Sequence, residues 1–196
     1  SRSDYNKIVN QYKKNLNERN KILFTNQFDN EWIEVVEKKI SQLGLEIYEL
    51  RNVQIKTINQ ELKLLNKKNN YKFNIELKIK DSFYENGLSE DSYMDLIRDC
   101  RIYDKKFGGL KVGPHKSDII AIINDEYEAS LLSTGQQKTI VLMILIAQCN
   151  FLIKDKNIKP ILLLDEICSH LDSTNRKILL DMIHEFDIQF FLTGTE

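Results

Sequence analysis

The first third of the chain carries apolar residues at helical spacing. Between residues 5 and 23 they recur at intervals of three, four and seven, along one face of a helix: Tyr5, Ile8, Val9, Tyr12, Leu16 and Leu23. After a polar break near residues 25–30, a longer stripe follows: Trp32, Val36, Ile40, Leu43, Ile47, Leu50, Ile58, Leu62 and Leu65. The pattern predicts two long helices that form an antiparallel hairpin or arm, with a kink at Gly44.

Beyond Asn69-Asn70 the pattern becomes that of short elements. Alternating apolar residues predict a half-buried strand over residues 71–79, followed by a loop over residues 81–90. Residues 92–103 are expected to form a helix that ends at Gly108-Gly109, with these residues inward: Tyr93, Leu96, Ile97 and Cys100. Short strands are predicted around residues 110–112 and 119–123, and Asn124-Asp125 marks a turn.

Four aliphatic residues at positions 161–164 lead directly into Asp165 and Glu166. Such a run predicts a strand buried on both faces, with its carboxylates at the carboxyl edge where parallel sheets bind ligands. An aspartate at that edge can hold Mg²⁺ directly or through water, and a glutamate beside it can position an attacking water. The segment therefore predicts a metal site at Asp165 and a hydrolytic role for Glu166.

A polar turn at residues 133–138 precedes the apolar run at residues 140–147. Ser133 is the expected N-cap of a helix, and Gly135 lets a ligand approach the backbone closely. The amino end of a helix favours an anion such as a phosphate. Each signal alone also fits an ordinary cap or an ordinary buried strand. Their order favours a nucleotide site: turn, helix, aliphatic strand, a Ser-x-Leu-Asp segment ending at Asp172, helix and strand.

This order resembles the ATP-binding-cassette ATPases of chromosome maintenance and DNA repair, and most closely the carboxyl-terminal portion of the RecF family. Residues 112–118 resemble the Gly-Pro-His element of that family, residues 12–23 the start of its helical lobe, and residues 189–193 its final strand. The expected fold class is α/β. Residues 96–196 would form the carboxyl-terminal half of an ABC-type P-loop ATPase head, and residues 1–95 a helical arm or lobe.

The resemblance assigns a role to each candidate residue. Ser133, Gly135, Gln136 and Lys138 would contact ATP held by a partner subunit, Asp165 would hold Mg²⁺, Glu166 would activate water, and Asp172 would couple the two sites. The implied function is ATP-dependent DNA binding in recombinational and replication-gap repair, through a homodimer that ATP closes on DNA. Duplex or gapped DNA, contacted at its backbone, and RecO- and RecR-like repair proteins are the implied partners.

A phosphate loop is missing from the sequence. Among its seven glycines, Gly108 and Gly113 have the required spacing, but Pro114 and His115 follow them instead of Lys and Ser or Thr. In relatives this loop lies upstream, so the chain is expected to correspond to a carboxyl-terminal piece that is inactive alone. Two alternatives remain open: a noncatalytic module that binds DNA or a partner, and a head fragment of a chromosome-maintenance ATPase.

Composition adds little to this picture. The formal net charge is −1, and the first 70 residues are mildly basic, which fits either phosphate contacts or a solvated helical face. The three cysteines lack CxxC spacing, and the three histidines form no metal motif. The apolar run at residues 140–147 is too short to span a bilayer, so a cytoplasmic protein without membrane contact is expected.

Overall fold

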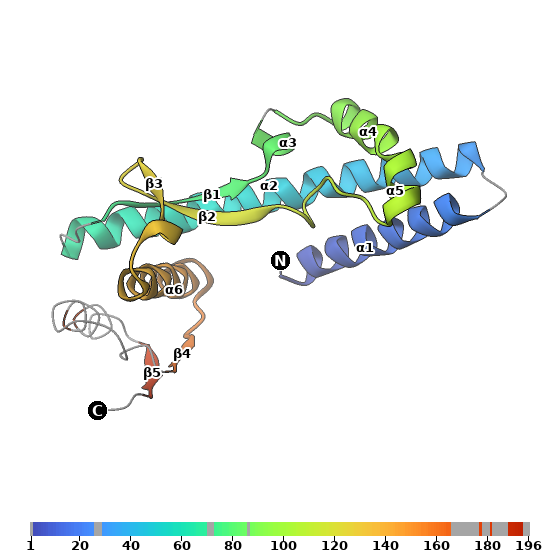
Figure 1. The fold of residues 1–196 in the computed structure, drawn as a ribbon. Helices are drawn as coiled ribbons and strands as arrows, with labels where there is room; N and C mark the ends of the chain where they lie inside the picture. Colours follow the sequence, from blue (N-terminus) through green and yellow to red (C-terminus); the bar gives the residue numbers. More distant parts are fainter. Residues whose placement is uncertain are drawn as a thin grey trace. The chain divides into compact units, whose positions relative to one another are not determined.

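The computed structural model describes residues 2–25, 29–69, 73–85, 87–165, 177, 181 and 188–193. The chain divides into two compact units. Unit 1 comprises residues 1–53 and 79–118, and unit 2 comprises residues 54–78 and 119–196. Figure 1 shows the elements in chain order. The functional division expected from the sequence, between residues 95 and 96, stays a prediction.

Helices α1 (Arg2–Phe24) and α2 (Asn30–Asn69) confirm the predicted pair of long helices, and they run in opposite directions in unit 1 (Figure 1). α2 begins at Asn30 because Asp29 Oδ1 accepts the backbone N–H groups of Glu31 and Trp32, each at 3.0 Å. The predicted stripe is wrong at Trp32, which is 48% exposed. The buried series instead begins one position later, at Ile33.

Gly44 does not interrupt α2, which is continuous through it. A Cβ atom at Gly44 would lie 2.6 Å from Tyr93 Cε1, closer than a side chain allows. The glycine therefore permits close packing against Tyr93, and the kink stays a prediction. Leu50, also placed on the apolar stripe by its spacing, is 39% exposed.

Three helices follow in unit 1, where the sequence predicted a loop and one helix. Residues 82–85 form α3 (Ser82–Glu85), whose first turn is capped by Asp81 Oδ1. The helix expected over residues 92–103 is two helices, α4 (Glu90–Asp99) and α5 (Arg101–Phe107), separated at Cys100. α5 ends at Gly108, as predicted. The strand predicted at residues 110–112 is wrong, since residues 110 and 111 have no regular structure and bends and turns follow over residues 112–116.

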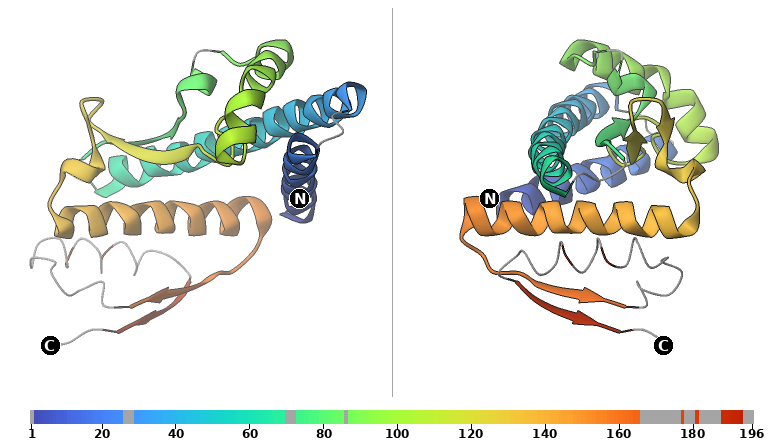
Figure 2. Two further views of the ribbon diagram at one scale, coloured as in Figure 1. Left: turned by 45° about the vertical axis from the view of Figure 1, so that its right-hand side comes forward. Right: turned by 90° about the vertical axis from the view of Figure 1, so that its left-hand side faces the viewer.

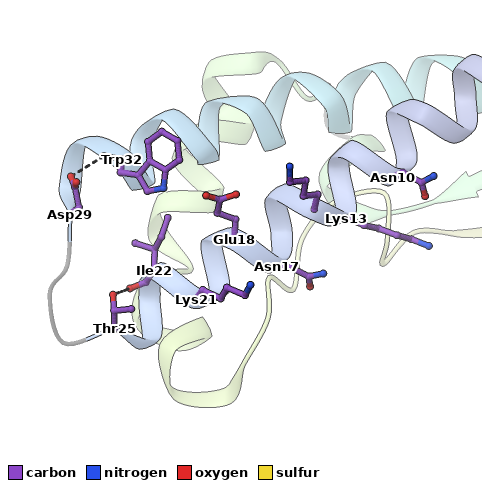
Figure 3. Close-up of a pocket in the computed structure, with 10 residues that line it drawn as sticks. Asn10, Lys13, Asn17, Glu18, Lys21, Ile22, Thr25, Asp29 and Trp32 are labelled. Carbon is purple, nitrogen blue, oxygen red and sulfur yellow. Dashed lines mark hydrogen bonds between the residues drawn. The ribbon is translucent and has the colours of Figure 1, made fainter.

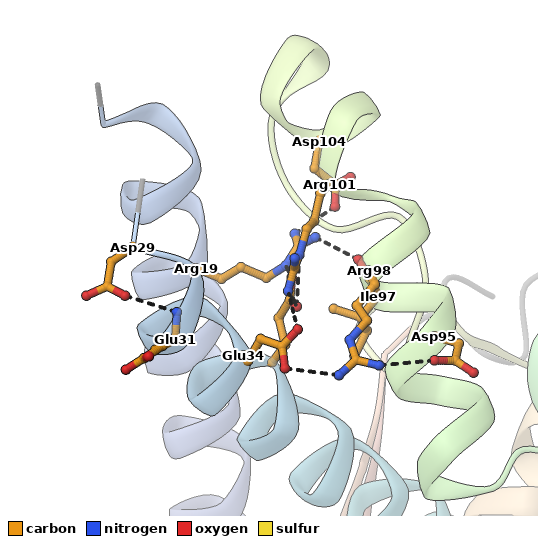
Figure 4. Close-up of polar contacts among 10 residues, drawn as sticks. Arg19, Asp29, Glu31, Glu34, Asp95, Ile97, Arg98, Arg101 and Asp104 are labelled. Carbon is orange, nitrogen blue, oxygen red and sulfur yellow. Dashed lines mark hydrogen bonds and ion pairs between the residues drawn. The ribbon is translucent and has the colours of Figure 1, made fainter. Parts of the chain in front are cut away.

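Arg19 lies at the centre of unit 1 and is fully buried. Its Nε donates to Glu37 Oε1 at 2.8 Å, its Nη1 to Asp104 Oδ2 at 2.7 Å and its Nη2 to the Ile97 carbonyl at 2.9 Å. Arg101 adds a contact of 2.5 Å to Glu37 Oε2. One guanidinium thus joins α1 to α2, α4 and α5 through charge-assisted hydrogen bonds (Figure 4).

Unit 2 contains a three-stranded sheet in the order β1-β2-β3. β1 (Ile75–Lys80) alternates buried and more exposed residues, as predicted, and β2 (Asp118–Ile123) matches the strand expected at residues 119–123. β2 pairs antiparallel with β3 (Tyr127–Glu128). Asn124 and Asp125 adopt φ angles of 53° and 61°, which is the left-handed conformation that tight hairpin turns require.

The remainder of unit 2 consists of η1 (Ala129–Leu131), α6 (Thr134–Lys156) and a parallel pair of strands, β4 (Ile161–Leu164) and β5 (Gln189–Leu192). α6 is long and apolar enough to cross a membrane by length and composition. Several of its apolar side chains are nevertheless buried, including Leu142, Met143 and Ile146. We therefore interpret α6 as a core helix.

Candidate nucleotide site

The amino end of α6 has the cap that the sequence predicts. Ser133 Oγ accepts the backbone N–H of Gln136 at 3.4 Å, and the backbone N–H of Ser133 donates to Gln136 Oε1 at 3.1 Å. This reciprocal pair is a capping box, which fixes the first turn of the helix. Ser133 and Thr134 are exposed, while Gly135 is half-buried. The predicted turn therefore lies at the surface of unit 2.

Gln137 also holds this turn, although the sequence analysis gave it no role. Its Nε2 donates to the carbonyls of Ser130 and Leu132, at 3.0 and 2.9 Å. The side chain thereby ties η1 to the start of α6. The position of Gln137 inside the motif at residues 133–138 was the feature of the sequence that could have indicated this role. Lys138 follows on the same helix and is half-buried.

α6 and β4 run in opposite directions (Figure 2). The amino end of α6 and the carboxyl end of β4 therefore face the same side of unit 2. Backbone N–H groups and the helix dipole give the first of these ends a positive electrostatic character. The second end carries the carboxylate of Asp165, so groups suited to phosphate and to a cation lie on one side of the unit.

Asp165 follows the last residue of β4 and is exposed, as the sequence predicts for a carboxylate at this edge. The Thr193 hydroxyl, which follows β5, donates a hydrogen bond to Asp165 Oδ1. The backbone N–H of Thr193 donates to the Leu164 carbonyl at 3.0 Å. Thr193 therefore orients the Asp165 carboxylate from the neighbouring strand, a role that the sequence analysis did not assign.

Carboxylate and hydroxyl oxygens are suitable ligands for Mg²⁺, and an exposed aspartate at this edge fits such an ion. Glu166 and Asp172, the other two predicted acids, lie outside the described residues. Among the residues that the structure describes, no group of three or more His, Cys, Asp or Glu side chains is placed to hold a metal. Among the described residues at this edge of the sheet, the oxygen atoms that could bind the ion thus belong to Asp165 and Thr193.

The predicted burial of β4 on both faces is wrong. Leu162 and Leu164 are buried, but Ile161 is 60% and Leu163 is 72% exposed. Phe191 of β5 lies opposite Leu163 in the parallel register and is also exposed. We call Ile161, Leu163 and Phe191 the bare face of the β4–β5 pair. Parallel sheets are normally covered on both faces, so this face is unusual for its topology.

The Gly-Pro-His element at residues 113–115 makes structural contacts within unit 1. His115 Nε2 donates to the Leu110 carbonyl at 2.8 Å, and its Nδ1 accepts from Tyr12 Oη at 2.9 Å. Tyr12 Oη in turn contacts Tyr93 Oη at 3.1 Å. Burial lowers the pKa of His115 and so favours the neutral ring, and the Leu110 carbonyl places its proton on Nε2. The contacts agree with the structural role that the turn-forming Gly-Pro pair suggests.

A nearby arginine holds the same element from α2. Arg51 Nη1 donates to the Pro114 carbonyl at 2.5 Å and to Ser117 Oγ at 2.8 Å. Gly113 has a φ angle of +119°, and a Cβ atom there would lie 2.0 Å from Tyr93 Oη. The glycine is required because the backbone passes directly over the two tyrosine hydroxyls.

Sequence comparison identifies relatives that cover almost all of the chain. The chain is 33% identical over 195 residues to the DNA replication and repair protein RecF of Rickettsia typhi, and 31% identical to the RecF of Rickettsia akari. The RecF of Agrobacterium fabrum is 30% identical over 196 residues. These alignments cover 94–96% of the chain and 50–53% of the relatives. No family model matches the sequence.

Structural comparison gives the same fold. A structure of the recombination mediator protein RecF with ATP, from the RecFOR pathway, superposes with a TM-score of 0.75 at 24% identity. A second RecF structure gives a TM-score of 0.76. Both cover 99% of this chain and 54% of the solved one. The resemblance to the RecF family and the α/β fold class are confirmed, and the chain spans about half the length of the curated relatives it matches.

Proposed function

Because the chain matches the carboxyl-terminal portion of RecF proteins along nearly its whole length, we propose that it works as one part of a RecF-like ATPase of DNA repair. The other part would supply the phosphate loop that this sequence lacks. In the complete protein, ATP would close a homodimer on DNA and hydrolysis would release it. The cycle requires that ATP bind the closed dimer more tightly than the open one.

Each predicted site residue has a role in this proposal. Ser133, Gly135 and Gln136, on the exposed first turn of α6, contact the phosphates of ATP bound by the partner subunit. The capping box must therefore rearrange or share its donors when the dimer closes. Lys138 adds positive charge near the same turn, and Asp172 couples the two nucleotide sites.

On the cis side, Asp165 binds the metal that accompanies ATP, and Thr193 keeps its carboxylate in one orientation. Mg²⁺ supplies charge neutralisation at the phosphates when it is bound. Glu166 orients the attacking water or accepts its proton. The arrangement uses the open carboxyl edge of a parallel sheet, which is where open α/β sheets bind their ligands.

The observation that carries the proposal is the parallel β4–β5 pair. It presents Asp165 at its exposed carboxyl end and leaves Ile161, Leu163 and Phe191 bare. A two-stranded parallel sheet with one bare face needs further strands or another layer to complete it. The phosphate-loop portion of a RecF-like ATPase head is a partner of the right kind to cover that face.

DNA is the proposed ligand of the dimer, in duplex or gapped form and contacted through its backbone, since the sequence carries no base-reading motif. RecO- and RecR-like proteins are the proposed partners, because one structural relative is described within the RecFOR pathway. Replication-gap repair in the cytoplasm is the corresponding setting. Such backbone contacts make the affinity fall steeply with salt.

Mixing experiments test the proposal. We would combine this chain with the unmatched half of the Rickettsia typhi RecF and measure ATP hydrolysis. Neither half alone should turn over, whereas the mixture should. Glu166→Gln should remove that turnover, and Asp165→Asn should reduce it by weakening metal binding. Asp181→Asn serves as the matched control, because it changes an exposed acid outside the site.

Full turnover in Glu166→Gln would end the catalytic assignment. A mixture that binds DNA without hydrolysing ATP would instead favour the noncatalytic binding module.

A further inference from the structure

Helix α5 is unusual because its apolar side chains face the solvent. Ile102 is 86% exposed, Tyr103 is 51% exposed and Phe107 is 57% exposed. Asp104 lies between them in the sequence and is the buried residue of the helix, bound to Arg19 Nη1 (Figure 4). A helix at the surface of a protein ordinarily has the opposite arrangement, with its apolar residues toward the core. α5 is therefore held inward by a charge and leaves its apolar side bare.

The exposed side chains share one face of α5. At about 100° of rotation per residue, residues 102, 103, 106 and 107 span about 140° of the helix circumference. The Tyr103 and Phe107 ring centroids are 4.5 Å apart, and Lys106 Nζ lies 5.2 Å from the Phe107 centroid. We call Ile102, Tyr103, Lys106 and Phe107 the α5 face. Adjacent apolar side chains of this size form a patch, and exposed apolar patches mark interaction sites.

The surroundings of the α5 face are basic. Lys105 lies on the same helix and Lys111 shortly after it, and both are exposed. Among the ion pairs of the residues that the structure describes, none involves Lys105 or Lys106. Asp99, at the end of α4, is the exposed acid nearest in the sequence. Positive charge therefore outweighs negative charge here, and an acidic surface is its electrostatic complement.

We propose that the α5 face docks an acidic amphipathic helix of another protein. The apolar side of that helix packs on Ile102, Tyr103 and Phe107, and its carboxylates lie near the lysines at the edge of the face. Packing against a second helix is a common way to cover an apolar helical face. Aromatic side chains supply the large contact areas that dominate such interfaces. The contact goes beyond the proposed function, because it needs neither ATP nor DNA.

Charge argues against a second copy of this chain as the occupant. In a two-fold contact, the same face of both subunits meets itself. The lysines of one α5 face would then lie against those of the other, and like charges at close range disfavour association. A nucleic acid would satisfy the lysines, but its phosphate backbone would leave Ile102 uncovered.

A second basic surface in unit 1 provides a matched control. Figure 3 shows a hollow of about 690 Å³ that α1 and the start of α2 line. Lys13 and Lys14 border this hollow, and they are adjacent and exposed, as Lys105 and Lys106 are. Trp32 gives the hollow an apolar side chain as well. An acidic helix that is attracted to lysines alone would bind there as well as at the α5 face.

Fluorescence anisotropy measures the docking. The probe is a dye-labelled peptide of about 18 residues, long enough to form a helix, with leucine on one side and glutamate and glutamine on the other. It is titrated with the 196-residue chain. A scrambled peptide of the same composition and a peptide with lysine in place of glutamate are the controls. The acidic helix should bind, and both control peptides should bind about tenfold more weakly or less.

Apolar variants locate the contact. Phe107→Ser should weaken binding about 5- to 30-fold, as expected when an aromatic anchor of an interface is truncated. Phe24→Ser is the matched control, because Phe24 is also the last residue of its helix and is 59% exposed. This control should bind as the unchanged chain does. Ile102→Ser repeats the test at a second exposed position, and far-ultraviolet circular dichroism checks that each variant folds.

Charge variants separate the electrostatic part of the affinity. Lys105→Gln/Lys106→Gln should weaken binding about 2- to 10-fold at low salt. This loss should shrink at about 0.5 M salt, because salt screens the attraction between exposed charges. The loss in Phe107→Ser should persist at high salt, because it comes from apolar contact. Lys13→Gln/Lys14→Gln should leave the affinity unchanged.

Several results would overturn the proposal. Absence of binding up to about 1 mM peptide would do so, as would equal losses in the two phenylalanine variants or in the two lysine pairs. Equal binding of the scrambled peptide or of a duplex oligonucleotide would indicate a surface that attracts any anion. A dimer of the chain that Phe107→Ser converts to a monomer would assign the face to a second copy. Competition by the unmatched half of the Rickettsia typhi RecF would assign it to that half. Because the assay contains no ATP, none of these results decides whether the mixed halves turn over.

Discussion

The two units differ in how their polar and apolar side chains are paired and covered. In unit 1 the buried Arg19 has acidic and carbonyl partners on three other helices, and the Tyr12, Tyr93 and His115 side chains bond to one another. In unit 2 the β4–β5 pair buries Leu162 and Leu164 but leaves its opposite face bare. Unit 1 pairs its buried arginine with its own acids, whereas unit 2 exposes a surface suited to a further layer.

This difference separates two kinds of burial. A buried charge must find its partners within the same fold, because leaving it unpaired costs several kcal/mol. An exposed apolar face costs less to the folded chain, but it favours association. The contrast predicts that unit 1 is sensitive to internal substitutions, and that substitutions on the bare face alter assembly more than stability.

The largest effect is expected at Arg19. Arg19→Met leaves the buried Asp104 without its partner and Glu37 with Arg101 alone, so unit 1 should lose about 3 to 5 kcal/mol of stability. Urea unfolding followed by Trp32 fluorescence measures this loss within unit 1. Arg98→Met is the control, because Arg98 pairs with Glu34 and Asp95 at the surface and should cost less than about 1 kcal/mol. Similar losses in both variants would contradict the special role of Arg19.

Gly113 is expected to come next. Gly87→Ala places a side chain in the left-handed region with open space around it, and should cost about 1 to 2 kcal/mol. Gly113→Ala adds a collision with Tyr93, so its loss should be about 1 to 3 kcal/mol greater. The same unfolding assay compares the two. If Gly87→Ala costs as much as Gly113→Ala, the close approach to Tyr93 is unimportant.

A smaller effect is expected from pH. The pKa of His115 is lowered in the fold by burial, so between pH 6.5 and its folded pKa the unfolded chain binds more protons. Its contribution to stability is complete above pH 6.5 and is lost as pH falls below that value. Urea unfolding at pH 7.5 and 5.5 should show a smaller decline in His115→Gln than in the unchanged chain. An identical decline in the two proteins would show that His115 contributes nothing.

Substitutions on the bare face should change the stability of the chain least. Ile161→Lys and Leu163→Lys replace exposed residues, so each should alter unfolding by no more than about 0.5 kcal/mol. Leu162→Ala, on the buried face, should cost about 2 to 5 kcal/mol. Thermal unfolding followed by circular dichroism compares the three variants. A cost for Leu163→Lys near that of Leu162→Ala would show that this face is already covered within the chain.

Periodicity and cap chemistry identified much of the fold from sequence. The hairpin of α1 and α2, the alternation of β1, the Asn124-Asp125 turn and the cap at Ser133 all depend on neighbouring residues, which a sequence displays directly. Long-range packing was not visible in this way. Gly44 was expected to kink α2, but its close packing against Tyr93, a residue distant in the sequence, was not predicted.

The candidate site was predicted in part for the same reason. Asp165 and the turn at residues 133–138 were found because their spacing along the chain is distinctive. Thr193 was assigned no part in it, because its hydrogen bond to Asp165 joins two strands separated by 24 residues of sequence. The burial of β4 was overestimated because an aliphatic run does not show how many layers surround it.

We propose that the bare face of the β4–β5 pair receives the phosphate-loop half of an ATPase head. Calorimetric titration of the unmatched half of Rickettsia typhi RecF into this chain tests that claim directly. We predict association with a negative heat-capacity change, as expected when apolar surface is buried. Leu163→Lys should abolish the association, and Leu64→Lys, which changes another exposed leucine of unit 2, should preserve it. No association, or association unaffected by Leu163→Lys, would contradict the account.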